Sequence, residues 1–157
     1  MFDTAFGLPL HPLIVHGVVV ALPTVAVAAV AVAAYGPWRR RLTLPLAVVA
    51  LGTSALAWVA AESGEAFNQR LGLPAVARAH TQLGDSLHLF ALYLTVALLV
   101  LGVLARRQRS AKAMVAVGVV LVLATTGLVA WRTILVGHSG SDAVWGEVVE
   151  TTQAPAG

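Results

Sequence analysis

Five histidines are the side chains of this sequence best suited to chemistry, and two of them are expected at one height in a membrane. His16 lies about 18 residues before the end of the first apolar run, roughly 27 Å at the helical rise. His88 lies about 17 residues before the end of the third run, roughly 26 Å. Ionisable side chains at membrane depth usually face the bundle interior and mark a functional site. We therefore expect His16 and His88 to form one layer.

A second layer is expected closer to water. His11, His80 and His138 each lie roughly 35 to 38 Å from the corresponding ends of their apolar runs. Glu62 and Arg132 lie at roughly 29 Å and join the first layer. All five histidines of the chain therefore fall in the same half of the predicted bundle.

A b-type haem fits the first layer. Four-helix bundles hold cofactors between facing helices, and haem iron accepts imidazole ligands. His16 and His88 are one such pair; Arg132 would then meet a propionate, while Gly17 and Gly84 would leave space for the macrocycle. Haem b is the cofactor that this interpretation predicts.

Copper or zinc fits the second layer. Both metals bind imidazole, and a carboxylate can complete the coordination shell. The candidate ligands are His11, His80, His138 and Glu62. A third interpretation needs no cofactor, because histidines also cap helices and form hydrogen bonds between them, and Arg132 can pair with Glu62.

Residue types exclude or disfavour other chemistries. The chain has no cysteine, which excludes disulfides, thiolate metal sites and cysteine-ligated iron–sulfur clusters. It has no Gly-rich phosphate loop and no His-Glu-x-x-His motif. Ser139, His138 and Asp142 are the residue types of a hydrolase triad, but three residues in one turn cannot build its geometry. Electron transfer is the only activity that the sequence indicates.

Four membrane-spanning helices must position these residues. The chain is 59% hydrophobic and 11% charged, with a mean hydropathy of +0.86, whereas soluble domains carry about 25% charged residues. A run of about 18 or more apolar residues is long enough to cross a bilayer. Four runs qualify: Leu13–Ala34, Leu42–Ala61, Leu87–Ala105 and Ala113–Val136. The predicted fold is all-α, a bundle of four transmembrane helices.

The charged residues predict how the bundle is oriented. Seven of the ten basic residues lie in the first and third connections, with no acidic residue among them. The positive-inside rule places both connections in the cytoplasm, so that both termini lie outside. Topology thus explains the net charge of +3, and no nucleic-acid partner is predicted.

The chain is expected to form one domain. Residues 1–146 are assigned to the transmembrane bundle and residues 147–157 to a disordered tail. We expect the first connection over Pro37–Leu42, an outward extension of the third helix within Pro74–Arg107, and a turn over Gly137–Gly140 that ends the fourth helix. No fixed-period repeat is visible.

Three motifs carry a family resemblance: Leu10-His11-Pro12-Leu13-Ile14-Val15-His16, Ala79-His80-Thr81-Gln82-Leu83-Gly84 and Gly137-His138-Ser139-Gly140. With four spans in this order, the chain resembles the bacterial membrane proteins of domain-of-unknown-function family number 2231. The matching positions are His11, His16, His80 and His138. The chain departs from the usual pattern at Gly17-Val18, where an aromatic residue and a proline often follow the second histidine.

The resemblance implies a redox setting in a bacterial cytoplasmic membrane. Members of that group are similar to small membrane cytochromes, and some resemble the membrane part of chains that carry a Rieske-type iron–sulfur domain. The leading hypothesis is a multi-pass redox protein with haem b near the outer face, as a candidate subunit of a respiratory electron-transfer assembly. The alternatives are a cofactor-free accessory subunit and a copper or zinc protein. The bilayer, other membrane subunits and a second copy of the chain are the candidate partners.

Overall fold

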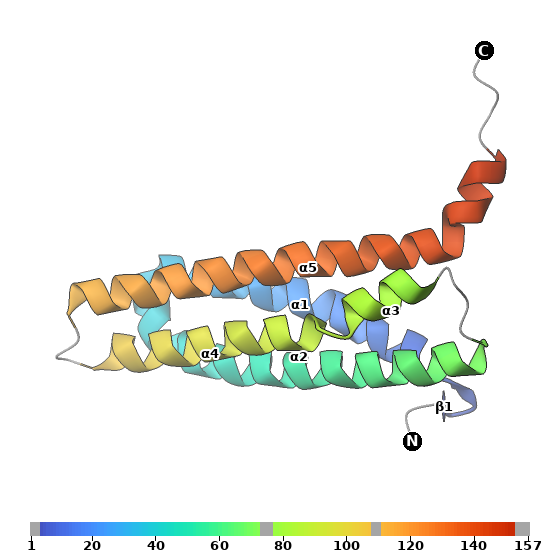
Figure 1. Cartoon of the computed structure of the whole chain (residues 1–157). Coiled ribbons are helices and arrows are strands. Elements are labelled where there is room, and N and C mark those ends of the chain that lie inside the picture. Colours follow the sequence, from blue (N-terminus) through green and yellow to red (C-terminus); the bar gives the residue numbers. More distant parts are fainter. Residues whose placement is uncertain (1–3, 73–76, 108–110, 153–157) are drawn as a thin grey trace, which may run out of the picture.

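The computed structural model describes residues 4–72, 77–107 and 111–152 of the chain. Long helices lie side by side along most of the molecule (Figure 1). In chain order the elements are β1 (Thr4–Ala5), β2 (Leu8–Pro9), α1 (Leu10–Ala34), α2 (Gly36–Arg70), α3 (Arg78–Gly84), α4 (Leu87–Arg106) and α5 (Lys112–Thr152). The two short strands pair antiparallel, with Thr4 opposite Pro9.

Four helical segments are long and apolar enough to cross a membrane. They are α1, α2, the segment that combines α3 with α4, and α5, with hydropathies of 1.9 to 2.4. Even α4, with 20 residues, reaches about 30 Å, the thickness of a hydrocarbon core. The prediction of an all-α protein with four spans is confirmed.

The first connection is shorter than predicted. Only Tyr35 separates α1 from α2, because α2 begins at Gly36. Pro37 occupies the first turn of α2, where its missing N–H leaves no hydrogen bond unmade. The predicted loop over Pro37–Leu42 is therefore wrong, and Arg39–Arg41 lie on the first turns of a helix.

The fourth spanning helix is longer than predicted. Helix α5 continues without a turn through Gly137–Gly140 and ends at Thr152. The lack of a side chain at Gly140 serves helix packing, because an imidazole lies against that position. Residues 147–152, expected in a disordered tail, are also helical and bend away from the bundle (Figure 1). Residues 153–157 lie outside the described part of the chain.

The third spanning segment is interrupted. Asp85 and Ser86 separate α3 from α4, so the expected outward extension is a separate helix of seven residues. Helix α3 packs against α2 and α5 at one end of the bundle.

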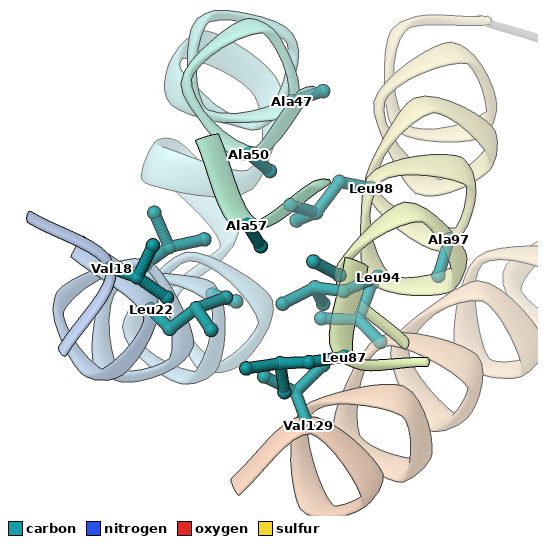
Figure 2. Packing of buried hydrophobic residues seen from close by; sticks show 14 of the residues in the cluster. Val18, Leu22, Ala47, Ala50, Ala57, Leu87, Leu94, Ala97, Leu98 and Val129 are labelled. Atoms are coloured by element: carbon teal, nitrogen blue, oxygen red, sulfur yellow. The ribbon is translucent and has the colours of Figure 1, made fainter. Parts of the chain in front are cut away.

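Small residues let the helices approach each other closely. Ala47 and Ala57 of α2 lie on the side that faces Leu94 and Leu98 of α4 (Figure 2), and all four are at most 2% exposed. Water provides no hydrophobic driving force inside a bilayer, so such close contacts are what hold spanning helices together. Branched side chains on the outside, such as Val27 at 71% exposed, suit contact with lipid.

The helices form a closed ring of neighbours: α1 packs against α2, α2 against α4, α4 against α5, and α5 against α1. The first and last described residues lie at the same end as α3 (Figure 1). At the opposite end the Arg106 guanidinium donates to the carbonyl of Arg41, at 3.2 Å, and links α4 to α2. The predicted basic connections therefore share one end of the bundle, although Arg109 lies outside the described residues.

Candidate functional site

His11, in the first turn of α1, is held by α2. Its Nδ1 lies 2.8 Å from the carbonyl oxygen of Ala60 and 3.4 Å from Oγ of Ser63. Gly64 leaves room for the ring, since a Cβ there would lie 2.9 Å from the imidazole Cε1. Phe67 stacks against the same ring, with 6.3 Å between centroids. A carbonyl can only accept a hydrogen bond, so Nδ1 carries the proton and the lone pair of the neutral ring is on Nε2.

His80, on α3, is held by α5 in the same way. Its Nδ1 donates to the carbonyl oxygen of Val136, at 3.0 Å, and lies 3.3 Å from Oγ of Ser139. A Cβ on Gly140 would lie 3.0 Å from the imidazole Cε1. The neutral ring of His80 therefore also keeps its lone pair on Nε2.

The two imidazoles meet. The centroids of the His11 and His80 rings are 6.3 Å apart, and their planes make an angle of 72°. A short hydrogen bond from Asn68 of α2 to Thr81 of α3, at 2.6 Å, braces the helices beside them. The structure thus places two side chains from the predicted second layer in direct contact.

Two cavities adjoin this pair, with volumes of about 420 and 620 Å³. Both are lined by His11, His16 and His80. The smaller reaches Phe67, and the larger continues between α1 and α5 as far as Trp145. Alanine, valine and glycine supply much of the remaining lining. Apolar walls with a few polar groups are typical of ligand sites of this size.

The structure does not bring His16 and His88 together in one cavity. His16 faces the cavities described above, while its Nδ1 donates to the carbonyl of Pro12 on its own helix. His88 lines a separate cavity of about 270 Å³ between α2 and the start of α4. Its Nδ1 is buried and has no hydrogen-bond partner among the described residues. This separation gives no support to a haem held by His16 and His88.

The predicted metal ligands are dispersed as well. Glu62 is exposed and lines the small cavity of His88, together with Glu65 and Asp85. His138 is exposed on α5 and lines none of the three cavities. Within residues 4–72, 77–107 and 111–152, no group of three or more histidine or acidic side chains is placed to hold a metal ion. Of the four predicted metal ligands, only His11 and His80 are in contact.

Arg132 links α5 to the start of α4. Its Nη2 donates to Oγ of Ser86 at 2.6 Å, and its guanidinium lies 5.6 Å from the centre of the Phe90 ring. It lines neither of the cavities beside His11. Its observed contacts are therefore those of an interhelical link.

We expect the substitutions Arg132→Met and Ser86→Ala to be non-additive. Each removes one partner of the same hydrogen bond, so the double variant should be less destabilised than the sum of the single variants, by about 0.5 to 3 kcal/mol. Unfolding of the purified variants in detergent measures this coupling. Additive changes in the free energy of unfolding would show that the bond contributes nothing.

Sequence reasoning did not identify the groups that hold the two imidazoles. Their signal is a Ser-Gly pair that occurs twice, at Ser63-Gly64 and Ser139-Gly140, toward the same end of the second and fourth spans. The carbonyl acceptors at Ala60 and Val136 carry no signal, because any residue provides a carbonyl.

Comparison with known proteins identifies the family but no annotated relative. No curated protein and no solved structure matches the chain. A family model described as "Predicted membrane protein (DUF2231)" matches residues 7–153. Those residues contain all four spans and the three histidine motifs, and the chain therefore belongs to the DUF2231 family of predicted membrane proteins.

Proposed function

We propose that the protein is a small membrane redox protein that holds one b-type haem in the cavities between α1, α2, α3 and α5. The observation that carries the proposal is the group of imidazoles, His11, His16 and His80, which line two mostly apolar cavities. Imidazole is a common axial ligand of haem iron, and helix bundles commonly hold cofactors between facing helices. Cavities of about 420 and 620 Å³ are within the usual range for such ligands.

The number of available ligands favours haem over a bare metal ion. Zinc takes about four ligands, of which the protein usually supplies at least three. The described residues contain no such group. Haem needs fewer protein ligands because the macrocycle supplies the other donors to iron. The donor set at this end of the bundle therefore suits haem better than it suits zinc.

The chain's own residues would bind the group and protect it. A bound haem would supply reversible one-electron chemistry. The imidazoles would orient it, and the surrounding valine, alanine and phenylalanine side chains would limit access of water, which helps to set a reduction potential. Electron donors and acceptors would then be other membrane subunits or lipid-soluble carriers beside the bundle.

A spectrum tests this proposal. The protein is purified in mild detergent from cells supplied with a haem precursor, and its absorption is recorded before and after dithionite. One haem per chain, with a Soret band and a sharp α band on reduction, supports the proposal. A featureless spectrum after haem addition contradicts it and favours the cofactor-free accessory subunit. Stoichiometric copper or zinc without haem favours the metal-binding alternative.

The proposal includes an orientation, with the histidine end of the bundle outside a bacterial cytoplasmic membrane. It is supported by Arg39–Arg41, Arg106 and Lys112 at the other end, because basic residues near span ends favour the cytoplasm.

Labelling of single cysteines tests this orientation without background, because the chain has no cysteine. We expect Thr151→Cys to react with a membrane-impermeant maleimide in intact spheroplasts. Gly36→Cys, at the opposite end of the bundle, should react only after the membrane is opened. The reverse pattern would contradict the proposed orientation.

A further inference from the structure

The bundle is built from two similar hairpins. The first hairpin comprises α1 and α2, and the second comprises α3, α4 and α5. Within each hairpin the helices pack together, and between hairpins α2 packs against α4 while α5 packs against α1. If α1 is exchanged with α4 and α2 with α5, every helix keeps the same kind of neighbours. This is the arrangement expected for an approximate two-fold axis along the bundle.

The histidine contacts repeat in the same register. In the first hairpin His11 meets a carbonyl at Ala60, a hydroxyl three residues later and a glycine four residues later. In the second, His80 meets a carbonyl at Val136, again with a hydroxyl and a glycine three and four residues later. Both serine hydroxyls also donate to the carbonyl that the histidine uses, at 3.0 and 2.9 Å. Each imidazole is therefore held by the same set of groups, which we call a cradle: Ala60, Ser63 and Gly64 for His11, and Val136, Ser139 and Gly140 for His80.

The cradles leave one nitrogen of each ring available. Nδ1 is occupied by a backbone carbonyl in both cases, and no hydrogen bond to either Nε2 is present among the described residues. Metal-binding histidines commonly donate their other N–H to a carbonyl or carboxylate, which sets the tautomer and orients the ring. A hydrogen bond from each Nδ1 to a carbonyl does not by itself bring the two rings together. The rings of His11 and His80 are nevertheless in contact.

The rings of His11 and His80 are close enough for both to reach one metal centre. A metal–nitrogen bond of about 2.0 Å and a ring radius of about 1.2 Å, counted on both sides, give roughly 6.4 Å between ring centres. The observed separation is 6.3 Å. The planes make an angle of 72° in an edge-to-face contact, so binding a metal through both Nε2 atoms requires the rings to turn toward a common centre.

From this repeat and this spacing we infer that His11 and His80 are paired ligands of one metal centre, each acting through Nε2. The inference rests on the proposed function where it identifies that centre as haem iron, and it replaces His16 and His88 as the ligand pair. The site is not fully symmetric: Phe67 stacks on His11, whereas the corresponding place three residues after Gly140 is Ala143.

Four single variants test the inference in the haem-loaded protein. His11→Gln and His80→Gln keep a donor for the backbone carbonyl but remove the strong ligand. His88→Gln and His138→Gln are the matched controls, because neither residue lines the cavities beside the pair. Electron paramagnetic resonance and absorption report the spin state. We expect the wild type and both controls to be low-spin, and His11→Gln and His80→Gln each to become high-spin. Added imidazole should restore the low-spin form.

The outcomes separate the inference from the proposed function. If haem binds and stays low-spin in both His11→Gln and His80→Gln, the ligand pair is wrong while the redox function stands. If the wild type binds no haem, the function fails, and the purified protein is titrated with Cu(I), an ion that two imidazoles can bind. One Cu(I) per chain, lost in both of these variants and kept in the controls, would support the paired site. Absence of Cu(I) binding in that case would overturn it.

Discussion

Gly64→Ala is expected to disrupt the histidine site although it should strengthen the helix. Alanine in a helix interior is favoured over glycine by about 1 kcal/mol. The new methyl group would lie 2.9 Å from Cε1 and 3.0 Å from Nδ1 of the His11 imidazole, which real Cβ atoms do not tolerate. The ring has to move, and it then loses its bond to the carbonyl of Ala60. We expect haem affinity to fall at least about tenfold, equivalent to 1.4 kcal/mol.

Gly140→Ala should act on His80 in the same direction but less strongly, because its methyl group would lie 3.0 Å from Cε1 and Nδ1 and the ring would have to move by only a few tenths of an ångström. Gly52→Ala and Gly127→Ala are the matched controls on the same two helices, since a Cβ at either position meets nothing within 4 Å and neither residue lines the cavities beside His11. Haem titration of the four detergent-solubilised variants measures the effect. Equal affinities in all four would show that the two cradles do not position ligands.

The spans were predictable because their signal is local. Leu87–Ala105 was predicted and α4 covers Leu87–Arg106, since a long apolar run bounded by charge has few alternatives in a membrane. The ends of α2 and α5 were less predictable. Glycine and polar residues usually end helices, but the segment around Gly140 stays helical where α3 packs against it.

The common height of His11 and His80 was predictable, but the direction in which the histidine side chains point was not. Counting residues placed His11 and His80 together, and the structure brings them into contact. The same count placed His16 beside His88, which line different cavities. Height follows from the rise per residue alone. The direction of a side chain depends on how its helix is rotated about its own axis in the bundle. Helices rich in alanine and valine have similar faces, so their sequence does not encode that rotation clearly.

The repeated cradle was hidden for a related reason. The number of residues between the histidine and the Ser-Gly pair differs between the two hairpins. The second hairpin contains the break at Asp85 and Ser86 and a longer connection between its helices. A search at one fixed period therefore finds nothing. The similarity is visible only in the contacts, where Ser63 and Ser139 occupy the same place relative to their histidines.

Leu98→Ala is expected to destabilise the bundle strongly. Leu98 is 0% exposed and lies near the alanines of α2 (Figure 2). Removing its three outer carbon atoms leaves a cavity among residues too small to fill it, and such changes cost about 2 to 5 kcal/mol. The loss arises mainly from packing contacts, because lipid is as apolar as the protein interior. Thermal unfolding in detergent, followed by circular dichroism, should show a clearly lower midpoint.

Leu99→Ala provides the control, because Leu99 is the next residue of the same helix and is 43% exposed. It has the same chemistry and the same helix propensity, but its side chain faces lipid or detergent, which can fill the space left by truncation. We expect its unfolding midpoint to stay close to that of the wild type. An equal loss in the two variants would mean that the buried side of α4 is not the one that contacts α2. The separation between Leu98→Ala and Leu99→Ala therefore tests the rotation of α4, the property that the sequence encodes least clearly and on which the placement of His88 depends.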